Sequence, residues 1–254
     1  MRSIYQYRDL IWTLVARDLK VRYRRSIIGL FWSMLQPLLT MAVLAIVFSS
    51  IFRFDIRNYP VYALAGLLFW NFFQQSIVVS MNSLRSHAYI LQKLPVPMIV
   101  FPVATVLSGV VNLCLAFVPL VGLLLVTGHR IGPSMLFLPV AVAIAVAFTL
   151  GAGLLLAPLA VFFTDVVEMV GVILTLLFYL TPVIYPKDIV PPKFQALVHY
   201  NPIRSILEVF RDPIYFGKFP PTTHLSLSIA VAVLALVVGL ISFRRSADRI
   251  PFYL

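Results

Sequence analysis

The chain has 254 residues, of which 61% are hydrophobic and 11% charged, and its mean hydropathy is +0.98. Soluble globular proteins carry about 25% charged residues, so this chain has too few charges to cover a water-exposed surface. The composition excludes a soluble protein and predicts an all-α integral membrane protein with a single domain over residues 1–254.

The formal net charge of +11 does not indicate a nucleic-acid partner, because of where the basic residues lie. Seven of the 20 Lys and Arg residues precede position 26, directly before the first long apolar run. Anionic lipid headgroups attract Lys and Arg at such positions. The charge therefore predicts contact with membrane lipids.

The first predicted element is an amphipathic interface helix over residues 4–25, which is too charged to cross a bilayer. Such a helix lies in the plane of the lipid headgroups. It is either a plain membrane anchor or a surface that contacts a cytoplasmic partner. On a helical wheel its polar side carries Asp9, Arg17, Lys20 and Arg24, and its apolar side carries Ile4, Tyr7, Ile11, Leu14 and Val15.

Six apolar stretches follow, and a helix needs about 20 such residues to cross the hydrocarbon core. The fifth is the shortest and has Glu168 near its start. No signal peptide is expected, because the first run is too long for a leader and no small-residue cleavage site follows it. The predicted transmembrane helices cover residues 26–52, 58–84, 97–127, 135–163, 167–185 and 225–243.

The distribution of Lys and Arg predicts that both termini are cytoplasmic, in a multi-pass protein of the cell inner membrane. With the amino terminus inside, the cytoplasmic segments hold 12 Lys and Arg residues and the external segments hold 8. Five of those 8 lie in the long segment 187–218. The positive-inside rule gives most weight to short loops near span ends, where the cytoplasmic excess is larger.

Residues 85–96, between the second and third spans, form a polar segment that ends at two closely spaced prolines, Pro95 and Pro97. A short helix ended by proline is expected, because the residue before a proline is pushed out of the helical region. This segment is either an ordinary loop or a rigid element that transmits force. His87 within it is expected to lie on the surface.

Residues 187–218 contain three proline turns, at positions 191–192, 201–202 and 212–213, with apolar residues at helical spacing between them. This pattern predicts two short helices between the fifth and sixth spans. Each is too short to cross the bilayer, so the two would lie on the external face or dip into it as a re-entrant pair. The segment is either a capping loop or an external gate.

The sequence contains no GxxxxGK[ST] phosphate loop, so this chain is not expected to bind ATP by that device. The middle of the predicted spans lacks the ionisable residues that a proton-driven carrier requires. The single cysteine, Cys114, has no His or Cys partner at metal-binding spacing. Active transport by this chain would therefore need energy from another protein.

Several segments resemble type-2 ABC exporter permeases, and in particular the group that exports O-antigen, capsule or teichoic acid chains. Residues 7–12 and 17–23, followed by Ser26, Gly29, Trp32 and Pro37, resemble the amino-terminal signature of that family. Residues 178–186 are similar to the end of its fifth span, and residues 200–211 to the segment that follows. Thr164 departs from the family, which often has a basic residue there.

The resemblance implies a homodimer bound to two copies of a separate ATPase, which would hold ATP and Mg²⁺ while this chain holds no cofactor. It implies that the amino-terminal helix and the loop 85–96 contact the ATPase. The residues expected at this coupling surface are Arg17, Arg22, Arg24, Arg85, His87, Tyr89, Gln92, Lys93, Asp165 and Glu168.

The resemblance also implies that spans one and five line a central path and that the segment after span five forms an outer gate. Aromatic faces suit the passage of sugar rings, although Trp and Tyr also collect at membrane interfaces. The aromatic residues expected along the path are Phe31, Trp32, Phe178, Tyr179 and Tyr185. The residues expected at the gate are Pro182, Pro186, Asn201, Pro202, Arg204 and Arg211.

These features together predict a non-enzymatic permease subunit that moves a lipid-linked polysaccharide, such as O-antigen or teichoic acid, out of the cytoplasm while its partner hydrolyses ATP. A drug or lipid exporter of the same superfamily is one alternative. A membrane-embedded transferase is another, with Asp165 and Glu168 as its one candidate catalytic pair.

Overall fold

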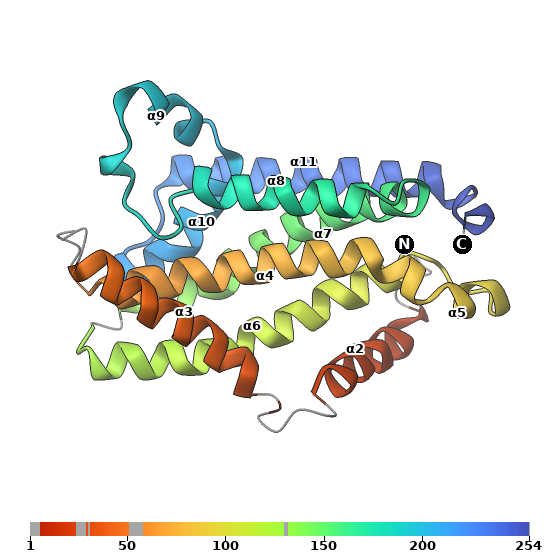
Figure 1. Ribbon diagram of the computed structural model, residues 1–254, viewed down its shortest axis with the longest axis horizontal. Coiled ribbons are helices and arrows are strands. Elements are labelled where there is room, and N and C mark those ends of the chain that lie inside the picture. Colours follow the sequence, from red (N-terminus) through yellow and green to blue (C-terminus); the bar gives the residue numbers. More distant parts are fainter. Residues whose placement is uncertain (1–5, 24–28, 30, 51–57, 130–131, 254) are drawn as a thin grey trace.

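A computed structural model describes residues 6–23, 29, 31–50, 58–129 and 132–253, and this part of the chain is helical without β-strands. Five of the described helices are long and apolar enough to cross a membrane, and they lie side by side in an elongated bundle (Figure 1). These are α3 (Phe31–Ser50), α4 (Tyr59–Ser86), α6 (Val100–Val126), α7 (Leu138–Phe162) and α11 (Thr222–Ala247).

The sixth apolar helix, α8 (Val166–Leu180), runs along the bundle but has only 15 residues. At 1.5 Å per residue it is about 22 Å long, which is shorter than the hydrocarbon core. It ends five residues before the predicted limit because Thr181, which precedes Pro182, adopts an extended conformation with ψ of 131°. The other five predicted spans agree with the observed helices to within a few residues.

The centre of the bundle is α4, which is buried over most of its length. It packs against α3, α6, α7 and α8. Its aromatic side chains fill the core: Phe69 and Phe73 lie parallel with centroids 6.2 Å apart, and Trp70 meets Phe178 of α8 edge-on at 5.4 Å. These aromatic contacts, together with neighbours on several sides, place α4 in the core of the bundle.

Helices α7 and α11 form the most extensive helix pair. A Cβ atom added at Gly151 would overlap the backbone of Ala235, and one added at Gly239 would overlap the backbone of Gly151. Small residues at this crossing let the two backbones approach closely, as is common between helices in membranes.

The amino-terminal helix α2 (Arg8–Tyr23) packs one side against α6. Ile11, Leu14 and Val15 of the predicted apolar side are buried, whereas Ile4 lies outside the described residues. The same cluster contains Phe101 at the start of α6 and Ile250 beyond α11. The first and last described elements therefore lie at the same end of the bundle.

The predicted pair of short helices occurs as α9 (Pro192–His199) and α10 (Pro202–Arg211). Figure 1 shows α9 outside the bundle at the end opposite to α5 (Ala88–Lys93). In contrast, α10 packs among α4, α7 and α11. The remaining short turns are η1 (Pro133–Phe137), η2 (Lys187–Ile189), η3 (Asp212–Phe216) and η4 (Ile250–Phe252).

Candidate transport and coupling sites

A cavity of about 880 Å³ lies between α2, α3, α4 and α6, and we refer to it as the polar cavity. Ten of its 23 described lining residues carry a hydroxyl or amide side chain, among apolar side chains that supply the larger share of the surface. The hydroxyl and amide residues of α4 are Asn71, Gln75, Ser76, Ser83 and Ser86, those of α6 are Thr105, Ser108 and Asn112, and those of α3 are Ser33 and Gln36.

The polar residues of α4 and α6 recur at helical spacing, so each helix turns a polar stripe toward the cavity. Asn71 and Gln75 are four positions apart on α4, and Thr105, Ser108 and Asn112 are three and four positions apart on α6. This spacing is visible in the sequence, but these residues were not predicted as site residues. Uncharged polar side chains leave a span apolar enough to cross a membrane, so they do not stand out within it.

Ser76 is the most informative residue of the lining. It is 3% exposed, and its Oγ atom has no hydrogen-bond partner. Gly109 of α6 lies opposite, where a Cβ atom would overlap Oγ of Ser76. The glycine therefore makes room for a buried hydroxyl group whose hydrogen-bonding capacity is unused.

One end of the polar cavity is lined by Arg17, Asp18 and His87. His87 Nδ1 lies 2.8 Å from the Ser83 carbonyl, and His87 Nε2 contacts the Arg17 guanidinium. These contacts assign the proton to Nδ1, which donates to Ser83, while Nε2 accepts from Arg17. The predicted surface position of His87 is wrong, because the ring is buried and lies tilted against Phe101, with centroids 4.8 Å apart.

The predicted coupling residues divide into a group on the surface of single elements and a group whose side chains connect elements. Tyr89, Gln92 and Lys93 are exposed on α5, and Lys93 Nζ lies 4.0 Å above the Tyr89 ring. Asp165 and Glu168 are exposed where α7 meets α8. This exposed group lies near the end of the bundle that α2 shares with the end of α11 (Figure 1).

The second group, Arg17, Arg85 and His87, connects helices to one another. Arg85 donates from Nη2 to the Val161 carbonyl of α7 at 3.3 Å, and Arg17 contacts both His87 and Asp18. The Tyr7 hydroxyl lies 3.5 Å from the Pro95 carbonyl and so joins the start of α2 to the segment after α5. The side chain of Arg22 and the whole of Arg24 lie outside the described residues.

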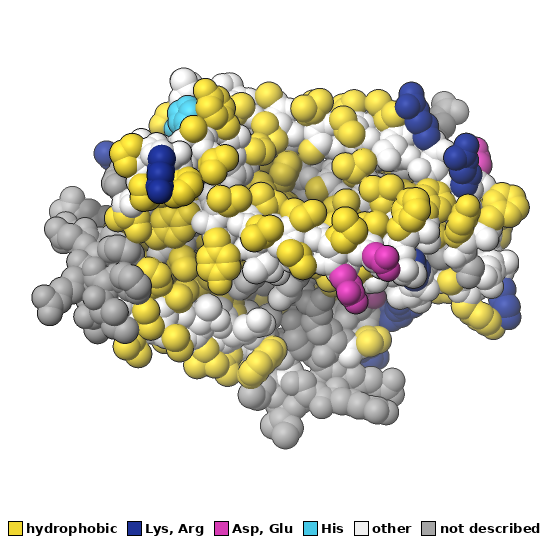
Figure 2. Space-filling model, turned by 45° about the horizontal axis from the view of Figure 1, so that its top comes forward, with side chains coloured by type: hydrophobic (Ala, Val, Ile, Leu, Met, Phe, Trp, Pro, Cys, Tyr) yellow, Lys and Arg dark blue, Asp and Glu magenta, His cyan; other side chains and the backbone are white. Residues whose placement is uncertain are grey.

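Of the five aromatic residues predicted along a path, Phe178, Tyr179 and Tyr185 lie together, apart from the cavity that Trp32 lines. Trp32 lines the polar cavity, whereas the neighbouring Phe31 is 71% exposed and does not. Phe178 packs on Trp70, Tyr179 is exposed, and the Tyr185 hydroxyl donates to the Tyr179 carbonyl at 2.6 Å. Figure 2 shows a largely apolar face with Lys and Arg side chains toward its two ends.

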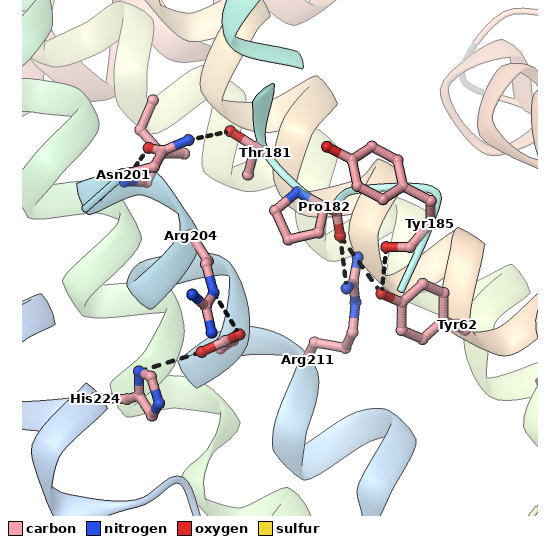
Figure 3. A network of polar contacts seen from close by, with 10 residues as sticks. Tyr62, Thr181, Pro182, Tyr185, Asn201, Arg204, Arg211 and His224 are labelled. Carbon is pink, nitrogen blue, oxygen red and sulfur yellow. Dashed lines mark hydrogen bonds and ion pairs between the residues drawn. The ribbon is translucent and has the colours of Figure 1, made fainter. Parts of the chain in front are cut away.

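Figure 3 shows separate sets of polar contacts in which the predicted gate residues Asn201, Arg204 and Arg211 take part. Arg211 is 3% exposed, and its Nη1 and Nη2 atoms donate to the carbonyl groups of Pro182 and Val183. Its guanidinium carbon lies 3.9 Å from the centre of the Tyr62 ring, a cation–π geometry. The Tyr62 hydroxyl in turn donates to the Tyr185 carbonyl at 2.9 Å.

Gly66 of α4 provides the space for Arg211. A Cβ atom at this position would overlap both the guanidinium group and the Val183 carbonyl. Tyr59, one helical turn before Tyr62, donates to the Ile184 carbonyl at 2.9 Å. One side of α4 thus holds the segment after α8, and sequence reasoning missed all three of these α4 residues.

The remaining gate residues fix both ends of α10. Asn201 accepts from the Ile203 amide at 3.0 Å, which caps the helix, and donates to Thr181 Oγ1 at 2.8 Å. Arg204 donates to Glu208 at 2.8 Å, and Glu208 also lies 3.2 Å from His224 of α11. Of the predicted prolines, Pro182 is buried, Pro186 is half-buried and Pro202 is exposed at the start of α10.

Burial sets the electrostatics around Arg211. Burial lowers the pKa of the Arg211 guanidinium, and nearby Tyr62 and Glu208 oppose that change. Burial, followed by the negative charge of Glu208, raises the pKa of Asp212 to about 6. Among the described residues, no group of three or more His, Cys, Asp or Glu side chains is placed to hold a metal ion.

Comparison with known proteins agrees with the resemblance inferred from the sequence. Residues 9–215 match the profile of the ABC-2 type transporter family. An O-antigen export system permease protein RfbA of Myxococcus xanthus is 34% identical over 93% of this chain and 92% of its own length. One from Klebsiella pneumoniae is 31% identical with the same coverage, and the polysialic acid transport protein KpsM of Escherichia coli is 19% identical over 91% of each chain.

Proposed function

This chain belongs to the ABC-2 type transporter family, and on that premise we propose that it is the permease subunit that exports a lipid-linked polysaccharide across the inner membrane. The observation that carries the proposal is its similarity, over nine-tenths of its length, to permeases named for O-antigen export. Relatives named for polysialic acid and capsule polysaccharide export support the same class of cargo. The chain itself is a membrane transport subunit.

The proposed complex contains two copies of this chain and two copies of a separate ATPase, with both termini of this chain in the cytoplasm. The sequence has no phosphate-binding loop of its own. Helix α5 carries the exposed side chains of Tyr89, Gln92 and Lys93 at the end of the bundle, where a cytoplasmic subunit has access to them. We assign the ATPase contact to this helix.

The contacts of α5 suggest how motion of the ATPase would enter the membrane. Only His87 separates α5 from the end of α4, so a displacement of α5 acts directly on α4. Arg85 links the same point to α7 through the Val161 carbonyl, and the contact of His87 with Arg17 links it to α2. Three elements would therefore move together.

Helix α4 would carry this motion to the opposite end of the bundle. Its 28 residues span about 42 Å. Near its start, Tyr59 and Tyr62 donate to carbonyl groups of the segment after α8, and Gly66 accommodates Arg211. In this mechanism α4 connects the ATPase contact to an external gate formed by α9 and α10, which open a route for the glycan.

The export function is tested by deleting the gene and measuring polysaccharide at the cell surface with a glycan-specific antibody. We expect loss of surface polysaccharide and its recovery with the wild-type gene. Surface polysaccharide that persists at the normal level without this gene would contradict the proposal. Loss of small-amphiphile export with normal surface glycan would favour a drug or lipid exporter.

The ATPase contact is tested by coexpression and pull-down with a candidate ATPase from the same genome. Simultaneous replacement of Tyr89, Gln92 and Lys93 by alanine should reduce recovery of the ATPase at least tenfold. The matched control replaces a Tyr, a Gln and a Lys of similar exposure around α9, namely Tyr200, Gln195 and Lys193, and should leave recovery unchanged. Equal recovery with both triple variants would remove α5 from the interface.

A further inference from the structure

We propose that the polar cavity binds a short, uncharged sugar segment of the exported glycan within a single subunit. This inference rests on the proposed function but adds a site apart from the predicted path. The aromatic residues predicted on α8 and after it, Phe178, Tyr179 and Tyr185, do not line this cavity. Its walls are α2, α3, α4 and α6.

The dimensions of the cavity suit a short segment. Its volume of about 880 Å³ falls within the range of about 300–1,000 Å³ that pockets for small organic ligands occupy. A long polymer does not fit in such a space, whereas a few linked sugar rings do. The cavity would therefore hold one part of the chain at a time.

The lining matches the chemistry of a sugar. Asn71 and Gln75 each offer an amide donor and an amide acceptor, and the serine and threonine hydroxyl groups do both. Sugar hydroxyl groups likewise donate and accept, so neighbouring hydroxyl groups pair well with such side chains. Trp32 and Phe72 add flat apolar surfaces against which the C–H faces of a sugar ring can pack.

The hydroxyl group of Ser76 provides an independent indication of a ligand. It is buried, it lines the cavity, and it has no hydrogen-bond partner. Buried polar groups without partners are uncommon and costly in native proteins. A hydroxyl group of a bound sugar would supply the missing partner.

The charges at the cavity favour a neutral ligand over a phosphate group. Arg17 is the cation among the described lining residues, and it is already engaged by Asp18 at 3.6 Å and by His87. An anionic headgroup would have to compete with the Asp18 carboxylate for this guanidinium. The sugar portion of the cargo is therefore the better occupant.

The binding experiment uses the full-length permease in lipid nanodiscs. The probe is a set of fluorescently labelled oligosaccharides released by mild acid from the producing strain's own surface polysaccharide. Combined substitution Asn71→Leu and Gln75→Leu should weaken binding at least tenfold. The matched control, Asn82→Leu with Gln195→Leu, removes the same two amides outside the cavity and should change binding less than twofold.

Substitution Ser76→Ala separates loss of binding from loss of folding. Because it removes an unpaired buried hydroxyl group, it should leave the thermal unfolding midpoint unchanged or raised. Oligosaccharide binding should nevertheless weaken about three- to tenfold, the effect of one hydrogen bond. Unchanged binding in this variant and in the double variant would overturn the sugar site.

Three further outcomes distinguish the explanations. If the wild-type gene restores surface glycan but the purified permease binds none of the oligosaccharides, the site is refuted and the export function stands. If the wild-type permease binds undecaprenyl phosphate but no oligosaccharide, and the double variant does not bind this lipid, the cavity holds a lipid carrier. That result would overturn the proposal. Failure of the wild-type gene to restore surface glycan would instead refute the export function.

Discussion

Helices α9 and α10 are neighbours in the sequence and begin in the same way, yet they lie in opposite surroundings. Each has a proline in its first turn, Pro192 in one and Pro202 in the other. Val198 is the buried residue of α9, whereas eight of the ten residues of α10 are buried. Proline therefore sets where each helix starts but not how deeply it lies.

Helix α10 is buried because its apolar side chains lie in the hydrophobic core, and its polar groups therefore need partners there. Arg204 pairs with Glu208, and Arg211 finds two carbonyl groups and the Tyr62 ring within the bundle. A buried cation is tolerated only when it is paired and hydrogen-bonded. Helix α10 thus depends on a particular set of partners, whereas α9 does not. Substitutions around the two helices test this contrast, from the largest expected effect to the smallest.

The largest effect is expected from Arg211→Ala. It would leave the Val183 carbonyl without its donor, weaken the pairing of Pro182 and open a void beneath Tyr62. We expect a loss of about 2–4 kcal/mol in the free energy of unfolding, seen as a lower thermal unfolding midpoint in nanodiscs. The exposed Lys193→Ala on α9 is the control. A change below about 0.5 kcal/mol in both variants would abolish the contrast.

A smaller loss is expected from Gly66→Ala, which forces a methyl group against Arg211 and the Val183 carbonyl. Overpacking of this kind costs about 1–3 kcal/mol. The control is Gly122→Ala on α6, where a Cβ atom meets no atom within 4 Å. That variant should be neutral or stabilised, because alanine favours a helix more than glycine does. Equal midpoints for the two variants would show that Gly66 provides no necessary space.

Asn201→Ala should lower the free energy of unfolding by about 1 kcal/mol, the usual contribution of a helix cap. Asn201 also donates to Thr181, so the loss has two sources. A double-mutant cycle with Thr181→Val separates them. The cap explanation requires that Asn201→Ala remain destabilising in the Thr181→Val background, and a vanishing effect there would assign the whole loss to the Thr181 contact.

At pH 7.5, Asp212→Asn should raise the free energy of unfolding by less than about 1 kcal/mol, after allowance for solvent screening. The pKa of Asp212 is raised from 3.8 to about 6, so the folded state favours the protonated form. The shifted pKa of Asp212 therefore adds to the free energy of unfolding below pH 4, and this contribution is lost as the pH rises through about 6. The asparagine variant should therefore unfold at a higher temperature than wild type at pH 7.5, with the gap closing toward pH 4. Exposed Asp165→Asn is the control.

The smallest effect is expected from Phe194→Ala on α9. The side chain is 47% exposed and α9 lies outside the bundle, so the unfolding midpoint should change little. Surface substitutions usually remain within about 0.5 kcal/mol. Destabilisation as large as that of Gly66→Ala would show that α9 is packed more firmly than its exposure indicates.

Local sequence was sufficient for the long helices and for the two short helices between α8 and α11. The apolar stretches predicted α3, α4, α6, α7 and α11, and the proline turns predicted α9 and α10. Asn201, Arg204 and Arg211 were chosen from the resemblance to the family, and each has its own polar partners in the structure. The neighbours of Arg211 on α4, Tyr62 and Gly66, were missed, because inside an apolar span they look like ordinary packing residues.

The sequence by itself determined the membrane class of this protein and the bounds of its long helices, because crossing a bilayer demands a continuous apolar stretch that local composition reveals. Tertiary structure alone decided which polar groups meet. Arg17 and His87 are 70 positions apart, and Tyr62 and Tyr185 are 123 positions apart. A buried charge or hydroxyl group is stabilised by whatever lies opposite, and the folding of distant segments fixes that partner.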